Sequence, residues 1–307
     1  MTWFLIALIG PFLYALTNHI DKILLEKYFK DGGVGTLMLF SSLLSALAIP
    51  FFYLVDPSVI KVSTINILVL AVVGILNILV LWCYLLALRN DEASVVVVFY
   101  QLVPLFGCIL GYFFLGEKLT QIQLVAMALI ILGTTLISFE IDSENNVKPR
   151  GKTILPMLAA AFFWALGSVI FKAVALEENL WRSLFWEHLM LLLVGIGIFL
   201  FIRPCRTSFL FALRNNSKAI LSLNVANESL YILGNVAVAF AYMLAPIGLV
   251  LLAESYQPLF VLAIGVFLTV FFPNISAERI QAKHVWQKLI SVGVAGIGTY
   301  LLLSSKP

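Results

Sequence analysis

Long apolar runs alternate with short polar segments along the whole chain. Ten such runs can be marked off, at residues 3–25, 34–55, 64–88, 94–114, 121–139, 153–176, 183–202, 219–243, 247–272 and 286–303. A helix needs about 20 apolar residues to cross the hydrocarbon core of a bilayer. The runs are too long and too continuously apolar for the roughly 10-residue alternating strands of a membrane barrel. The pattern therefore predicts an all-α polytopic membrane protein with ten transmembrane helices.

The composition agrees with a lipid environment. Of the 307 residues, 62% are hydrophobic and only 11% are charged, whereas soluble domains are about 45–50% apolar and about 25% charged. So much apolar surface cannot be buried inside a water-soluble fold of this length, so the bilayer is the expected partner. The net charge of +3 is scattered along the chain, and we expect no nucleic-acid binding.

The two halves of the chain resemble each other. Residues 14–22 (YALTNHIDK) and 164–172 (WALGSVIFK) share four identical residues at a constant offset of 150, and Pro104 and Gly111 recur as Pro258 and Gly265 at an offset of 154. With five helices in each repeat, the second copy must enter the membrane upside down. We therefore expect two inverted five-helix repeats, 1–140 and 153–307, joined by a polar connector at 141–152, with a binding site near the midplane between them.

One segment carries a family resemblance. Residues 93–120 (ASVVVVFYQLVPLFGCILGYFFLGEKLT) contain a small-residue turn, a helix with Pro104 and then Gly116-Glu117-Lys118, and the next helix carries Gly133. This pattern resembles the EamA-type repeat of the drug/metabolite transporter superfamily. The second copy departs from it, since a longer loop reaching Glu278-Arg279 replaces Leu-Gly-Glu. The resemblance implies a secondary transporter with both termini in the cytosol. It leaves the substrate open, because the family moves amino acids, sugars, nucleotides, amines and lipidic metabolites.

The eighth predicted helix carries a polar stripe that the repeat does not require. Its polar residues fall within an arc of about 100°, while their counterparts in the third helix are apolar except for Asn77. A seam of interhelical amide hydrogen bonds is one explanation. A carboxylate at midspan, however, costs about 2.5–3.5 kcal/mol and usually faces a cavity. We expect a cavity lined by the stripe residues Asn224, Asn227, Glu228, Tyr231, Asn235 and Tyr242.

Further polar residues that the two copies do not share extend this candidate site. Glu254 stands where the first copy has Tyr100, and Tyr84 shares a helix face with Asn77. His19, with Asn18 and Asp21, forms a polar arc near the end of the first helix, where headgroup contacts are an equally good explanation. Glu187 and His188 lie near the start of the seventh helix and are either interfacial or part of the site. The expected substrate-binding residues are Asn77, Tyr84, His19, Asn224, Asn227, Glu228, Tyr231, Asn235 and Glu254.

These residues favour transport over catalysis. The chain has no HExxH, GxSxG, P-loop or GxGxxG motif, so neither an enzyme nor an ATP-driven pump is expected, and no cofactor or resident metal. Carboxylates beside tyrosine rings attract an ammonium group, which favours a small amine-bearing cation or zwitterion carried by alternating access. Desolvation favours a protonated carboxyl and a bound cation an ionised one. Glu228 and Glu254 are therefore candidate proton-coupling groups.

Three alternatives stay open. A carrier of divalent metal or another cation would use Glu187, His188, Glu228 and Glu254 together with asparagine oxygens. A channel would need a pore-lining ring of repeated residues, which the one-sided stripe disfavours. An intramembrane enzyme could use Glu228 and His188, although no nucleophile is evident.

The distribution of charge bears on location. We expect a monomer in a bacterial inner (plasma) membrane. Most lysines and arginines follow the first, third, fifth, seventh and ninth helices, above all in the basic segment 203–218, taken as a loop. The positive-inside rule then places both termini outside the cytosol, against the orientation that the family resemblance implies. The charge count is the basis of our prediction.

Overall fold

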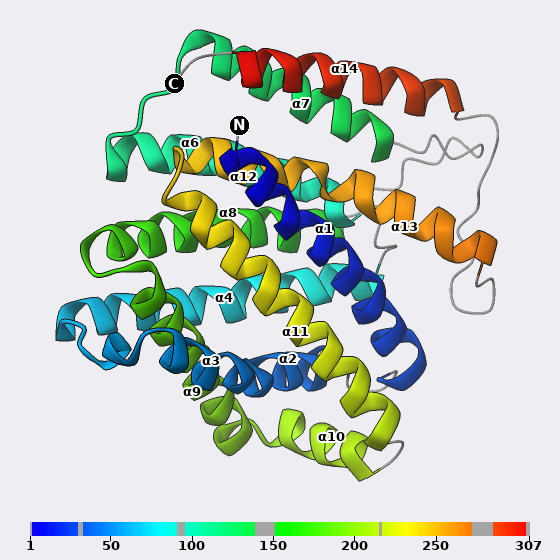
Figure 1. The fold of residues 1–307 in the computed structure, drawn as a ribbon. Coiled ribbons are helices and arrows are strands. Elements are labelled where there is room, and N and C mark those ends of the chain that lie inside the picture. The colour runs from blue at the N-terminus through cyan, green and yellow to red at the C-terminus, as the bar shows by residue number, and fades with distance from the viewer. Residues whose placement is uncertain are drawn as a thin grey trace.

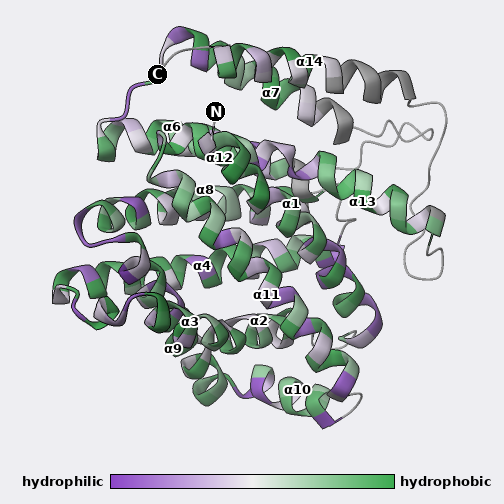
Figure 2. Ribbon diagram, in the orientation of Figure 1, coloured by the Kyte–Doolittle hydropathy of each residue, from purple (hydrophilic) through white to green (hydrophobic). Residues whose placement is uncertain are grey.

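The computed structural model describes residues 2–29, 33–90, 96–138, 151–214, 217–271 and 285–304, and these residues form helices and short connections without a strand. Every described helix is mainly apolar except α10 (Figure 2). The elements are α1 (Thr2–Ile23), η1 (Leu24–Tyr28), α2 (Gly33–Leu44), η2 (Ser45–Leu47), α3 (Ala48–Val55), η3 (Pro57–Ile60), α4 (Thr64–Asn90), η4 (Val97–Gln101), α6 (Leu102–Leu115), α7 (Gln121–Ser138), α8 (Gly151–Glu177), α9 (Leu180–Phe201), α10 (Arg203–Arg214), α11 (Ser217–Tyr242), α12 (Ile247–Ala253), η5 (Glu254–Tyr256), α13 (Gln257–Phe271) and α14 (Val285–Ser304).

The predicted all-α membrane class is confirmed. Within the described residues, six helical segments are long and apolar enough to cross a bilayer: 2–28, 33–55, 64–90, 152–177, 180–201 and 247–269. Shorter apolar helices occupy 99–115, 121–135 and 293–304. The helix α11 belongs to neither group, and it is the helix that carries the polar stripe. Large apolar side chains such as Leu54, Phe113 and Phe201 are 75–84% exposed, which suits a surface facing lipid.

One predicted loop is wrong. The basic segment after α9 forms the 12-residue helix α10, whose Phe209 and Ala212 are buried while Arg203 and Arg214 are exposed. The ring of Phe209 lies 4.6 Å from that of Phe40 and 5.9 Å from that of Phe199. Burial of one apolar face against α2 and α9 therefore stabilises a helix that the charged composition concealed.

The long helices pack in pairs that join the two halves of the chain (Figure 1). α1 lies along α11, α4 lies along α8, and α7 lies along α14, while α2 and α3 pack on α9. The helix α6 packs on both α8 and α12. One side of the molecule, which lies to the left in Figure 1, contains the start of α1 and the ends of α3, α6, α8, α11 and α14. We call this the termini side.

Glycines allow α1 and α11 to approach closely. A Cβ atom on Gly10 would lie 2.2 Å from Cγ2 of Val238, and one on Gly234 would lie 2.7 Å from Cε1 of Tyr14. Small residues at such contacts let helix backbones come together in a membrane. The contact holds Tyr14 against α11, beside the polar stripe.

Candidate functional site

A cavity lies between the two halves of the chain, at the contact of α1 and α4 with α8, α9 and α11. Its volume is about 120 Å³, several times the 10–15 Å³ that one water molecule needs. Polar side chains, aromatic rings and a few aliphatic groups share its wall. The residues lining it are Tyr14, Thr17, Asn18, Asp21, Ser41, Asn77, Val80, Leu81, Tyr84, Tyr100, Trp164, Gly167, Ser168, Phe171, Glu187, Leu191, Asn227, Glu228, Tyr231, Asn235, Val238, Tyr242 and Gln257.

Asp21 is held at one end of this cavity by neutral donors. The Asn227 amide donates to Oδ1 of Asp21 at 2.7 Å, and the Tyr84 hydroxyl is 3.2 Å from Oδ2. Asn18 donates to Tyr84 at 2.6 Å and accepts from Gln257 at 2.7 Å. Asp21 is 5% exposed. Residues from α1, α4, α11 and α13 thus fix one carboxylate without a basic partner in this network.

Glu187 is held in the same way by amides from two other helices. Asn77 of α4 donates to Oε1 at 2.8 Å, and Asn235 of α11 lies 3.4 Å from Oε2. Glu187 is 6% exposed. The carboxylate at the start of α9 is therefore oriented by the polar residues of the third and eighth apolar segments.

Three residues of the cavity wall carry acceptor atoms that have no donor among the described residues. Glu228 is 3% exposed, and its Oε1 has no hydrogen-bond partner among the described residues. Asn227 Oδ1 and Gln257 Oε1 are buried and equally unpartnered there. All three residues line the cavity. The described wall therefore has a surplus of acceptors, and the ligand it suits is one that brings hydrogen-bond donors.

Aromatic rings form much of the remaining wall. The ring of Tyr14 makes an edge-to-face contact with that of Trp164, with centroids 5.9 Å apart, and a tilted contact with that of Tyr231 at 5.5 Å. Tyr100 lies 4.9 Å from Trp164 and 6.1 Å from Tyr84. The electron-rich faces of such rings attract cations. Aromatic rings therefore line the same cavity as Asp21, Glu187 and Glu228.

No lysine, arginine or histidine is among the described residues that line the cavity. The two lysines conserved between the repeats lie away from it. Lys22 donates to the Leu88 carbonyl at 3.1 Å, and Lys172 to the Ala245 carbonyl at 2.7 Å. Each lysine therefore binds a backbone carbonyl within its own half of the chain: Lys22 near the end of α4, and Lys172 in the turn after α11. Within the described ranges no group of three or more His, Cys, Asp or Glu side chains could hold a metal ion.

Most predicted site residues come together at the cavity. Asn77, Tyr84, Asn227, Glu228, Tyr231 and Asn235 line it. Three others are buried nearby but do not line it. Asn224 donates to the Ile220 carbonyl of its own helix, His19 lies 3.0 Å from the Val261 carbonyl, and both carboxylate oxygens of Glu254 are buried without a partner among the described residues.

Two acids and several rings line the cavity although the sequence pattern does not single them out. Asp21 and Glu187 lie near the ends of their apolar runs, where contacts at the membrane interface explain them equally well, yet both line the cavity. Tyr14, Tyr100 and Trp164 also line it. The sequence did offer one signal for these rings: Tyr14 and Trp164 occupy matching positions in the two repeats, at the same offset of 150 as the matching lysines.

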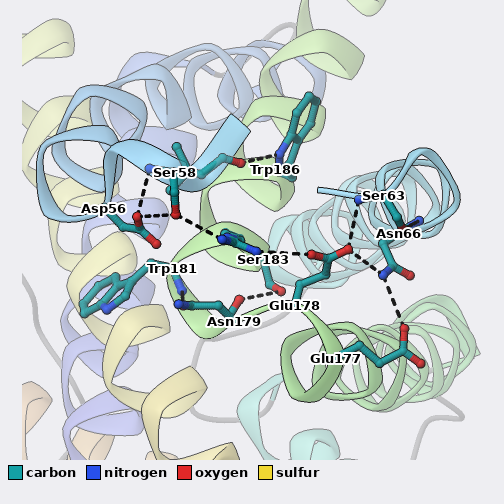
Figure 3. Close-up of polar contacts among 12 residues, drawn as sticks. Asp56, Ser58, Ser63, Asn66, Glu177, Glu178, Asn179, Trp181, Ser183 and Trp186 are labelled. Carbon is teal, nitrogen blue, oxygen red and sulfur yellow. Dashed lines mark hydrogen bonds and ion pairs between the residues drawn. The ribbon is translucent and has the colours of Figure 1, made fainter. Parts of the chain in front are cut away.

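On the termini side, a polar cluster joins the α3–α4 connection to the α8–α9 corner (Figure 3). We call it the clasp; it comprises Asp56, Ser58, Ser63, Asn66, Glu177, Glu178, Arg182 and Trp186. Glu178 accepts from the Ser63 backbone N–H and from the Asn66 amide, both at 2.9 Å, and lies 3.6 Å from Arg182. The Ser63 N–H above all holds the pKa of Glu178 below its usual range. Ionised Glu178 therefore ties the two halves together.

A second set of contacts joins the two halves on the same side, through the Gly116-Glu117 pair of the family motif. Gly116 ends α6 with φ 66°, a conformation that favours glycine. Glu117 can then accept from Lys172 at 2.6 Å and from the Ile247 N–H at 2.6 Å. The motif thus joins the first half to the second at α8 and at the start of α12.

The fold is that of an all-α integral membrane protein with a central cavity, and comparisons with known proteins agree with this class. Residues 1–139 match the EamA-like transporter family, which confirms the resemblance over the first half of the chain. The uncharacterized transporter YxxF of Bacillus subtilis (strain 168) is 29% identical over 94 residues, 30% of this chain and 30% of that protein. The chain thus aligns with under a third of this relative, whose bacterial origin supports a plasma-membrane location.

A solved crystal structure shares the fold over nearly the entire chain. The similarity has a TM-score of 0.63 and covers 96% of this chain and 98% of the other, at 14% sequence identity. At this identity the likeness concerns the fold alone. The family match over residues 1–139 is what points to a membrane transporter.

Proposed function

We propose that the protein is a secondary transporter that carries a small amine-bearing cation or zwitterion across the membrane by alternating access, coupled to protons. One observation carries the proposal: Asp21, Glu187 and Glu228 are buried around one cavity whose described lining contains no basic side chain. Buried charges need a partner of opposite sign. A cationic substrate, or protons when the site is empty, would supply it.

The hydrogen-bonding pattern supports an ammonium group in particular. An ammonium offers three N–H donors and no acceptor. The unpartnered wall atoms of Asn227, Glu228 and Gln257 are all oxygens that can accept a hydrogen bond. An ammonium would satisfy several of them, whereas a phosphate or a carboxylate would add further acceptors beside the acids.

We further propose that the chain is built from two inverted repeats of five membrane helices, related by a twofold axis through the cavity. Exchanging the repeats turns the α1–α11 pair into α8–α4 and the α6–α8 pair into α13–α1, and all four pairs pack together. Residues at matching positions also touch. Tyr14 contacts Trp164, and Gln101 donates to the Ser255 carbonyl at 2.9 Å. Contacts between counterparts are expected where a twofold axis passes.

A carrier explains the closed termini side better than a channel does. The clasp and the Glu117–Lys172 link both join the first half to the second on that side, and alternating access requires such contacts to break as the other side closes. We propose that Glu228 exchanges its proton for the substrate. Glu254, buried with both oxygens unpartnered among the described residues, is a second proton site behind the wall.

Thermal stabilisation of the purified protein tests the ligand class. The panel contains monoamines, amino acids, nucleotide sugars, inorganic phosphate and divalent metal ions. We expect stabilisation by amines that weakens at low pH, as protons compete for the carboxyl groups. Stabilisation by a metal ion alone, or by a phosphate compound alone, would overturn the amine assignment. Saturable counterflow in liposomes then separates a carrier from a channel.

A further inference from the structure

The carboxylates of Asp21 and Glu187 contact the same helix, α11, at two positions along its length. Asp21 binds Asn227 and Glu187 binds Asn235, and both asparagines belong to α11. Glu228 and Tyr231 lie between them in sequence and also line the cavity. From this arrangement we infer that the preferred substrate is a linear diamine, whose two ammonium groups bind Asp21 and Glu187 at the same time. The inference rests on the proposed function and narrows its substrate class.

The spacing sets the length of the diamine. Asn227 and Asn235 are eight residues apart, which is about 12 Å along a helix at 1.5 Å per residue. An ammonium nitrogen lies about 3 Å from a carboxylate oxygen that it binds. Each carboxylate lies within 3.4 Å of one of these two amides, so we take the backbone spacing of the asparagines as the separation of the carboxylates. Roughly 6–7 Å then separates the two nitrogens, the length of four or five methylene groups at about 1.2 Å per bond of extended chain.

Both anchors keep room for a cation. An ionised carboxylate has about four acceptor sites, and the described contacts of Asp21 and Glu187 use one donor on each oxygen. The donors are neutral amides and a hydroxyl, which orient the carboxylates without neutralising them. A single ammonium could neutralise one anchor and would leave the other without a counter-ion. A dication neutralises both, and Glu228 is left to hold a proton.

The wall between the anchors suits a methylene chain. Leu81 follows Asn77 by one helical turn, toward Tyr84, and Leu191 follows Glu187 by one turn. Both aliphatic side chains line the cavity, as does Val80. The cavity therefore offers aliphatic surface, beside Glu228, between the two anchoring carboxylates.

The test compares diamines with monoamines of equal length on the purified full chain. Binding is measured by thermal shift and by calorimetry for 1,4-diaminobutane, 1,5-diaminopentane, 1,8-diaminooctane, butylamine and pentylamine. We expect the two short diamines to bind about tenfold or more tightly than the monoamines, since a second charge-assisted contact is gained. Glu187→Gln should remove that advantage while monoamine binding at Asp21 remains.

A second variant keeps the inference testable if Glu187→Gln does not fold. Glu187→Asp retains the charge but withdraws it by one methylene, so the preferred diamine should become one carbon longer. The matched control is Glu26→Gln, a carboxylate beside Lys22 and outside the cavity, which should leave the length preference unchanged. Equal binding of monoamines and diamines would overturn the diamine inference and leave the amine transporter standing. Binding of no amine at all would overturn the proposed function itself.

Discussion

At the scale of single residues, Glu228 differs from the other two cavity acids. Asp21 and Glu187 each have a donor on both oxygens, whereas Oε1 of Glu228 has none among the described residues. A desolvated carboxyl with one oxygen left without a fixed donor is suited to take up and release a proton. Glu228 is therefore the residue on which proton coupling is best tested.

We expect Glu228→Gln to abolish the pH dependence of uptake in liposomes. The amide preserves the size of the side chain and can still hydrogen-bond, so expression and melting temperature should stay near those of the unaltered protein. Uptake is measured over a range of internal and external pH, with Glu26→Gln as the control. Retention of the normal pH dependence by Glu228→Gln would exclude this residue as the coupling site.

Two asparagines of the polar stripe on α11 offer a matched comparison within one helix. Asn227 donates to Asp21, whereas Asn224 donates to the Ile220 carbonyl of its own helix. A hydrogen bond to a charged group contributes about 1.5–3 kcal/mol. Asn227→Leu should therefore weaken amine binding by about tenfold or more, and Asn224→Leu should change it little. Equal losses in calorimetry would mean that the stripe acts through the fold of α11 and not through Asp21.

The stripe on α11 was predictable because a helix places its side chains at fixed angles, and the other repeat supplied a comparison. The facing partners were not. Asp21 and Glu187 come from α1 and α9, and only the packing of these helices on α11 brings them to Asn227 and Asn235. Asn224 shows the reverse: it belongs to the periodic stripe, yet its side chain is satisfied within its own helix.

At the scale of elements, the clasp makes the closed termini side depend on pH. Hydrogen bonds to ionised Glu178 hold its pKa below the usual value. A group with a lowered pKa in the folded state stabilises that state above its unfolded pKa, near 4.3, and the contribution is lost as pH falls through the folded value. The clasp is thus fully formed at neutral pH and weakens in acid.

We expect Glu178→Gln to lower the melting temperature by about 2 °C at pH 7, because the ionised acceptor of the Ser63 N–H is lost. The difference from the unaltered protein should shrink as the pH is lowered below about 4. Glu177→Gln is the control, since Glu177 makes a single longer contact with Asn66, at 3.3 Å. A difference that is independent of pH would show that the charge of Glu178 does not hold the clasp.

Element positions followed well from the apolar runs, whereas their interruptions did not. The ninth run is divided into α12, η5 and α13, and the second run into α2, η2 and α3. Each break lies about one turn before a proline, Pro50 in the second run and Pro258 in the ninth, whose missing N–H leaves an earlier carbonyl without its helical partner. Such a break leaves the apolar character of the run unchanged. The helix α10 was missed for a related reason: its charged residues dominate the composition, while burial of Phe209 stabilises the helix.

At the scale of the whole molecule, the distribution of basic residues predicts an orientation. The basic helix α10 lies on the side opposite the termini side, as do the end of α4 with Arg89 and the start of α11 with Lys218. The positive-inside rule places that side in the cytosol. A reporter that is active only outside the cytosol, fused after Pro307, should therefore be active. Activity of a cytosolic reporter at the same position would reverse the orientation and with it the side to which the clasp faces.

The two halves must also separate on the termini side if the protein works by alternating access. Replacing Ser63 and Glu178 by cysteine, with Cys83, Cys108 and Cys205 changed to alanine, allows a short cleavable linker to join the clasp where the Ser63 N–H meets Glu178 at 2.9 Å. The linked protein should still bind amines, because the cavity lies apart from the clasp, but transport should stop. Cleaving the linker should restore transport, whereas each single-cysteine variant treated with the same reagent should transport throughout. Full transport by the linked protein would mean that the clasp is a static tie, and the opening would have to be sought elsewhere in the fold.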